Sequence, residues 1–207
     1  MKKRLLAGLA TGMLMFGMVE TANAVPTTLV DQGSSWQYSV LNNDLWLNWN
    51  SAGYNSFNWN DPNITWLTGN AAFGNPYSLP YNTLWNASTD LALQKNFNID
   101  GVLTAPITLN VASDNGFMVF INGQQVAKQN AEGYTSYWEY SLPLTTLDFI
   151  SPGDNLIQVL AEDHGVATFI DLKLTGEVAP VPEPATMLLF GTGIAGLAGT
   201  RLRRKKQ

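Results

Sequence analysis

Turn-forming residues interrupt this chain every few positions. From Trp36 to Trp85 it carries six of its seven tryptophans, but Gly, Pro, Asn and Asp break the stretch before a helical period can build up. Farther along, Asn122 and Gly123 give the strongest short hairpin signal, because both residues tolerate a positive φ. This punctuation predicts many short strands and no convincing helix between the two ends of the chain.

Six later runs alternate apolar and polar residues or are continuously apolar, as strands do. Turns are expected at 114–116 and at 152–153, where Asp-Asn-Gly and Pro-Gly occur. The expected strands are 92–99, 107–112, 117–121, 124–127, 156–161 and 169–174. Short strands separated by turns predict an antiparallel all-β sandwich of jelly-roll type.

The body of the chain, from residue 25 to about 180, is acidic. It holds three lysines, no arginine and fourteen carboxylates, which gives a formal charge of about −11. Nucleic acid and anionic membranes are poor partners for such a surface, since both need clustered positive charge. The chain has no cysteine, so disulfides, thiolate chemistry and cysteine zinc sites are excluded. Neutral sugars, cations and basic partners stay open.

The N-terminus has the layout of a secretory signal peptide. Positive charge at 2–4 precedes an apolar run over 5–19, and Ala22 and Ala24 form a small-residue cleavage site. We expect residues 1–24 to direct export through Sec-type machinery and to be removed after Ala24.

Four segments of the body carry a recurring set of turn and aromatic residues. They are Trp66, Gly69, Ala71, Phe73 and Gly74; Lys95 and Phe97; Asp114, Gly116, Phe117, Asn122 and Gly123; and Pro152, Gly153 and Asn155. In this order the segments resemble the galactose-binding-like β-sandwich modules attached to many glycoside hydrolases and surface proteins. The resemblance implies one sandwich domain over 25–178, in a family whose members bind sugars, other proteins or nothing known.

Catalytic signatures are weak in this sequence. The one histidine, His164, stands in a loop context without a Gly-x-Ser-x-Gly elbow. Glu162 and Asp163 are adjacent, and adjacent strand residues point to opposite faces, so the two carboxylates would not converge on one bond. We therefore expect a non-enzymatic body.

Calcium is the one cofactor that the sequence suggests, because hard cations bind carboxylate and carbonyl oxygens. Modules of the resembled type often hold a structural calcium, and Asp114, Asp154, Glu162 and Asp163 are the candidate ligands. The alternative is that these residues form Asx turns and a solvated acidic rim.

Aromatic rings among amides are the usual equipment for binding sugars. Rings at Trp46, Trp49, Tyr54, Trp59 and Tyr77 lie among many asparagines and could stack on an exopolysaccharide. The alternative is that most of these rings fill the core, as large aromatic side chains generally do.

The C-terminus combines three features over 179–207. Val181, Pro182, Glu183 and Pro184 form an extended Pro-Glu-Pro segment, and an apolar helix is expected over about 185–200. Its fourteen-residue apolar run from Met187 to Thr200 is short for a membrane span, which needs roughly 20 residues. The end of the chain is basic and favours a cytoplasmic location for 201–207. Its positive residues are Arg201, Arg203, Arg204, Lys205 and Lys206.

This layout resembles the PEP-CTERM sorting signal of biofilm-forming bacteria. The resemblance implies that the membrane protease exosortase recognises Pro-Glu-Pro and removes the helix. We expect an inner-membrane-anchored precursor that faces the periplasm and is then released to the cell surface or extracellular matrix. The alternative for the body is a carbohydrate-binding module.

Overall fold

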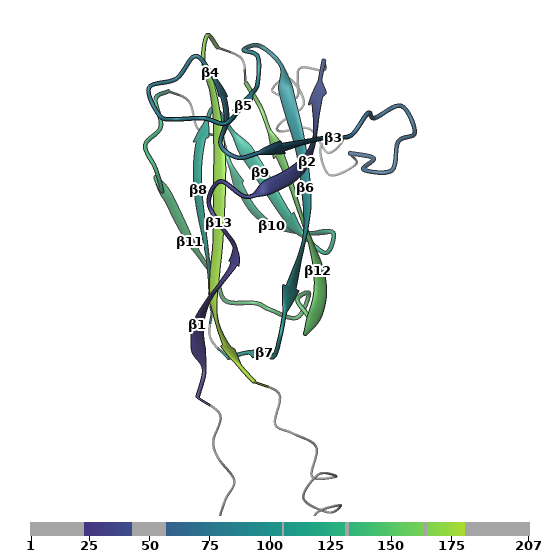
Figure 1. Ribbon diagram of the computed structural model, residues 1–207, viewed down its shortest axis with the longest axis vertical. Coiled ribbons are helices and arrows are strands. Elements are labelled where there is room, and N and C mark those ends of the chain that lie inside the picture. The colour runs from purple at the N-terminus through teal and green to yellow at the C-terminus, as the bar shows by residue number, and fades with distance from the viewer. Residues whose placement is uncertain (1–22, 43–56, 105, 131–132, 164, 181–207) are drawn as a thin grey trace, which may run out of the picture. The chain divides into compact units, whose positions relative to one another are not determined.

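The computed structural model describes residues 23–42, 57–104, 106–130, 133–163 and 165–180. Within these residues the chain forms thirteen strands and no helix, arranged as two sheets packed face to face (Figure 1). Residues Ala24–Ala179 make one compact unit. The expected all-β sandwich is confirmed.

The first sheet, sheet A, has seven strands. They are β1 (Val25–Val30), β4 (Phe73–Asn75), β5 (Thr83–Leu84), β7 (Val102–Leu103), β8 (Ile107–Asp114), β11 (Tyr140–Leu144) and β13 (Thr168–Ala179). Their order is β11-β8-β13-β4-β5, with β1 and β7 also paired to β13. The β4–β5 pair is parallel and the other pairs are antiparallel.

The second sheet, sheet B, has six strands in the order β10-β9-β12-β6-β2-β3. They are β2 (Ser35–Leu41), β3 (Leu67–Asn70), β6 (Asp90–Ile99), β9 (Phe117–Ile121), β10 (Gln124–Gln129) and β12 (Gly153–Ala161). All pairs in this sheet are antiparallel. Each of the six runs expected from alternation coincides with a strand, displaced by a few residues at the ends.

The core lies between the two sheets. Inward residues of β8 and β13 face the same side because they are paired in register, as in Val111 with Leu172 and Leu109 with Leu174. Trp85 is fully buried there, and its indole N–H donates to the Thr89 carbonyl at 3.1 Å. Alternation along each strand thus places one row of apolar residues in the core and leaves the next row on an outer face.

The Asn122-Gly123 hairpin is present between β9 and β10. Both residues have positive φ, 49° and 81°, as a tight two-residue connection requires. The Asn122 amide donates to the Phe149 carbonyl at 2.7 Å and to the Asn155 side chain at 2.8 Å. The turn is therefore fixed both by backbone preference and by contacts to the start of β12.

Strand β1 was not expected from the sequence. It contains Pro26, which disfavours a central strand, but β1 pairs only with β13 and proline is tolerated at a sheet edge. Val25, the first residue after the expected cleavage site, pairs with Val178. The two ends of the folded body therefore lie side by side (Figure 1).

Candidate ligand-binding surfaces

Trp59 belongs to an aromatic cover over the outer face of sheet B. We call Leu41, Phe57, Trp59 and Trp66 the tryptophan cap. The Trp59 ring lies 4.7 Å from Phe57, edge-on, and 6.4 Å from Trp66, stacked at 14°. The cap packs on outward-facing apolar residues of β6, β9 and β12. They are Ala92, Met118, Phe120 and Leu160.

Of the rings predicted to bind a sugar, the structure describes some and leaves others outside the described residues. Trp59 is half-buried, and packing accounts for the ring contacts given above. Trp46, Trp49 and Tyr54 lie outside the described residues, so their role stays a prediction. Trp36 and Trp85, which were not among the candidate rings, are buried in the core.

The four calcium candidates do not share one place. Asp154 lies near the start of β12, where it is exposed and accepts a hydrogen bond from the Asn98 amide at 2.8 Å. Glu162 and Asp163 follow the other end of the same nine-residue strand. Asp114 joins these two, because the Asn115 N–H donates to the Glu162 carbonyl at 3.1 Å. Three candidates therefore lie at one end of the sandwich and Asp154 at the other.

The expected solvated rim is wrong for those three carboxylates. Asp114, Glu162 and Asp163 are all buried, since the 86–89 and 165–167 segments fold against this end and the Asp163 carboxylate accepts the Ser88 N–H. Among the described residues, no group of three or more histidine, aspartate or glutamate side chains is arranged to hold a metal ion. His164 lies outside the described residues.

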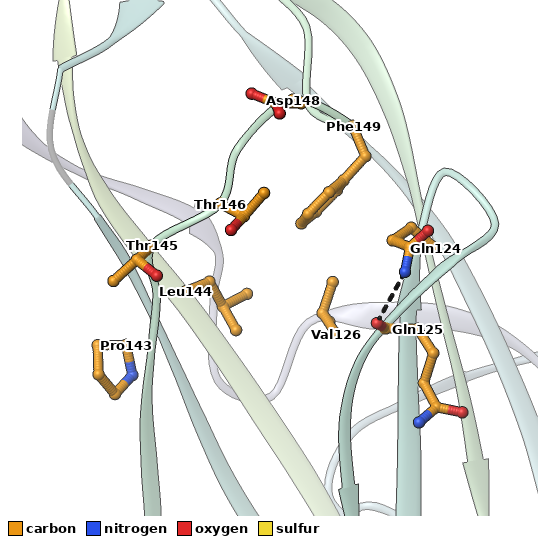
Figure 2. Close-up of a pocket in the computed structure, with 9 residues that line it drawn as sticks. All are labelled: Gln124, Gln125, Val126, Pro143, Leu144, Thr145, Thr146, Asp148 and Phe149. Carbon is orange, nitrogen blue, oxygen red and sulfur yellow. Dashed lines mark hydrogen bonds between the residues drawn. The ribbon is translucent and has the colours of Figure 1, made fainter.

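A groove of about 670 Å³ opens between the edges of the two sheets, at β10 and the segment that follows β11. Figure 2 shows the side chains of Val126, Leu144 and Phe149 along its floor, with Gln124 and Thr146 at its sides. We call it the seam groove. None of its lining residues is basic. Its lining combines an apolar floor, neutral hydrogen-bonding groups and one carboxylate, Asp148, and so favours a ligand without negative charge.

The outer face of sheet A also carries an aromatic cover. We call Tyr77, Leu79 and Tyr137 the tyrosine cluster; it packs on Ala72, Ala112 and Phe169. The Phe169 ring is 5.1 Å from Tyr77 and 5.6 Å from Tyr137. Tyr77 is among the rings that the sequence suggested for sugar binding, but Tyr137 is not, because the two tyrosines come from two loops that only the fold brings together.

Asp171 is buried on this same outer face. Burial raises the pKa of its carboxyl from 3.8 to about 6, although the N–H groups of Leu172 and Gly33 donate to it at 2.8 and 3.4 Å. The residue is 2% exposed. Its negative charge is therefore held in an unfavourable environment at neutral pH.

Comparison with known proteins identifies the C-terminus. Its sequence matches the family model for the protein-sorting motif of exosortase substrates over residues 180–205. This segment is a PEP-CTERM protein-sorting motif. The PEP-CTERM motif indicates an exported protein with a membrane-anchoring C-terminal signal, and it implies exosortase as the sorting partner.

The motif residues and the basic end lie beyond the last described residue, Pro180. The described part of the chain contains no helix of the length and apolarity needed to cross a membrane. The expected helix over 185–200 falls outside that part, as does Ala22 of the expected cleavage site.

The body has distant likenesses in solved structures. It is similar to β-glucuronidase from Ruminococcus gnavus in complex with D-glucaro 1,5-lactone, at 9% identity and a TM-score of 0.47. The same enzyme in complex with D-glucaro-d-lactam matches at 7% identity and a TM-score of 0.48. Each match covers 76% of this chain, which spans about 30% of the enzyme's length. No curated protein matches the chain in sequence. No statement about activity follows from likenesses this distant.

Proposed function

We propose that this chain is the precursor of a non-catalytic surface or matrix protein, whose β-sandwich is exported, anchored briefly in the inner membrane and released by exosortase. The observation that carries the proposal is the junction at Ala179. Strand β13 ends there, and the PEP-CTERM motif begins at the next residue. The compact body is thus completed before the sorting signal starts, so removal of the signal would leave every described strand in place.

The first test replaces the glutamate of the motif. We expect Glu183→Ala to block processing, so that the protein keeps its C-terminal segment and stays with the membrane fraction. Intact-mass analysis and fractionation of the native host measure both effects. Glu177→Ala is the matched control, because Glu177 is an exposed glutamate six residues upstream, in β13 and outside the motif. Normal mass and location for Glu183→Ala would contradict the proposal.

Carbohydrate binding is the second candidate function of the body. It is favoured by the absence of basic residues around the seam groove and by the neutral amides and hydroxyls at its sides. A charge of about −11 on the body also favours uncharged or cationic ligands over acidic ones. Retention of the exported protein on an affinity gel made with the host's own exopolysaccharide tests this function. Passage of the protein through that gel without delay would contradict it.

A further inference from the structure

A second pocket, at the end of the sandwich where β8 turns into β9, has a different character from the seam groove. We call it the tyrosine pocket. Its volume is about 560 Å³, and it is lined by residues 76–78, 133–134 and 165–167 together with Asp114 and Asn115. Three loops and one turn therefore converge on a single concave site.

The tyrosine pocket gathers exposed apolar surface. Val166 is 84% exposed and Tyr134 is 68% exposed, the highest values for large apolar or aromatic side chains among the described residues. Both line this pocket. Exposed apolar groups concentrated at a hollow mark a binding surface more strongly than the same groups scattered singly.

Tyr134 is the outermost ring of a supported stack. Its ring lies 5.0 Å from Tyr77 at an interplanar angle of 12°, and Tyr77 in turn lies 5.1 Å from the fully buried Phe169. The Thr135 N–H donates to the Tyr77 hydroxyl oxygen at 2.6 Å. The outer face of Tyr134 is thus a flat apolar surface on a fixed foundation, which lowers the entropy cost of binding.

Oxygen acceptors surround the other side of the pocket. The buried Asp114 carboxylate lies beside the Tyr77 hydroxyl. Near Gly165, the side-chain oxygens of Asp163 and Asn115 lie 3.7 and 3.9 Å from the position that a Cβ would occupy. None of the residues lining the pocket is basic. Such a site attracts hydroxyl or ammonium donors and repels carboxylates and sulfates.

The protonation of Tyr77 agrees with this arrangement. Burial, together with the charge of Asp114, raises the pKa of the Tyr77 hydroxyl above its ordinary value. The hydroxyl therefore stays protonated at neutral pH and does not add negative charge to the pocket.

We propose that the tyrosine pocket binds one pyranose unit without negative charge, with the apolar ring face on Tyr134 and a hydroxyl or amino group toward Asp114. A pyranose presents a flat C–H face and a rim of donors, which are the two features that this pocket can accept. An amino sugar gains a charge-assisted hydrogen bond and is bound more tightly than a neutral one. This inference rests on the carbohydrate-binding candidate function and gives it a site and a ligand class.

The other two surfaces offer less for a sugar ring. Phe149 in the seam groove is half-buried and packs against the main core. Trp59 is half-buried and is held between Phe57 and Trp66. The seam groove also has a carboxylate, Asp148, but its ring is half-buried, whereas Tyr134 combines a freely exposed ring with the neighbouring carboxylate of Asp114.

Titration calorimetry of the exported protein with three matched series tests the proposal: oligosaccharides of glucosamine, of glucose and of glucuronate. We expect glucosamine to bind most tightly, glucose more weakly and glucuronate least. Tyr134→Ala should weaken binding about tenfold or more, whereas Tyr134→Phe should stay within about twofold because the ring is kept. Asp114→Asn should remove the preference for glucosamine over glucose.

Thr146→Ala tests the seam groove as the rival site: a sugar bound in that groove would lose affinity, whereas a sugar bound in the tyrosine pocket keeps its affinity within about twofold. Loss of binding in Thr146→Ala with none in Tyr134→Ala would overturn the site and keep carbohydrate binding. Equal or tighter binding of glucuronate would overturn the ligand class. Failure of all three series, in a protein that exosortase still processes normally, would overturn the inference and leave the surface-protein proposal standing. If Asp114→Asn does not fold, the affinities of Tyr134→Ala and Tyr134→Phe decide whether the pocket binds the sugar. Both variants are expected to fold, because the Tyr134 side chain is exposed.

Discussion

Aromatic side chains cover both outer faces of the sandwich, but the aromatic residues differ: tryptophan on sheet B and tyrosine on sheet A. On sheet B, the tryptophan cap folds back over apolar residues of β6, β9 and β12. On sheet A, the tyrosine cluster folds back over Ala72, Ala112 and Phe169. In both cases an aromatic loop seals a sheet face that strand alternation would otherwise expose to water.

The difference lies in the rings that cover the buried acid, because carboxyls are buried on both outer faces. On sheet B, Asp90 is buried and lies two residues before Ala92 in β6, on the same face. On sheet A, the buried carboxyls are those of Asp114 and Asp171. These two acids share that face because Asp114 pairs with Phe169 and Asp171 follows two residues later in β13. A phenol can pack its ring and still hydrogen-bond a carboxylate, which suits tyrosine to such a site. On sheet A the aromatic cover therefore combines packing with a contact to buried acid, as Tyr77 does with Asp114 at the candidate site.

Phe169→Ala should give the largest effect. The ring is fully buried and contacts both Tyr77 and Tyr137, so we expect a loss of about 3–5 kcal/mol in the free energy of unfolding. Urea denaturation followed by tryptophan fluorescence measures it. A loss below about 2 kcal/mol would mean that the tyrosine cluster relaxes into the gap and is not a fixed cover.

Trp59→Ala should cost about 3 kcal/mol, at the low end for a large aromatic residue because the ring is half-buried. Trp59→Phe should recover part of the loss, since a smaller ring can still contact Phe120, now 6.1 Å away. The same urea measurement applies to both. If Trp59→Ala leaves the free energy of unfolding unchanged, the tryptophan cap is only loosely packed. Trp59 would then again be a candidate for sugar binding.

Asp171→Asn should stabilise the protein at neutral pH. The folded pKa, about 6, lies above the unfolded value of 3.8, so the wild-type protein loses stability as pH rises between these values and carries the full penalty above pH 7. We expect the substitution to recover about 2–3 kcal/mol there, at 1.36 kcal/mol per pKa unit. Thermal unfolding at pH 7.5 and pH 4 measures the difference. An equal gain at both values would show that charge burial is not the cause.

Tyr134→Ala should give the smallest change in stability, within about 0.5 kcal/mol, because the side chain is 68% exposed. Combined with a large loss of sugar affinity, this result would separate Tyr134 from the structural tyrosines beneath it. A loss of stability comparable to that of Phe169→Ala would place Tyr134 within the packed cover and remove its role as an open platform. Thermal unfolding of Tyr134→Ala and Tyr134→Phe side by side makes the distinction.

Local signals in the sequence predicted most of the fold. The Asn122-Gly123 turn, the alternating runs and the Pro-Gly step before β12 are each read from a few neighbouring residues, and all are present. Strand β1 was missed because Pro26 argues against a strand, and only its place at the edge beside β13 makes it acceptable. The candidate site was predicted only in part, since Tyr77 was among the aromatic residues selected and Tyr134 was not.

The burial of the acidic residues was likewise not predictable from the sequence. Asp114 and Glu162 were selected from the sequence as candidate calcium ligands or members of a solvated rim, and their burial was not foreseen. Exposure depends on whether another loop folds over the residue, and the loop that contributes Ser88 is far away in sequence. No local pattern carries that information.

The sequence by itself determined the destination of this protein and the class of its fold. A sorting motif is read by another protein as a linear segment, and turns and alternation act over a few residues, so neither needs the rest of the chain. Only the tertiary structure decided which aromatic rings meet water and which acids are buried. Those properties arise when segments remote in sequence close over the two outer faces of one sandwich, with tryptophan on sheet B and tyrosine on sheet A.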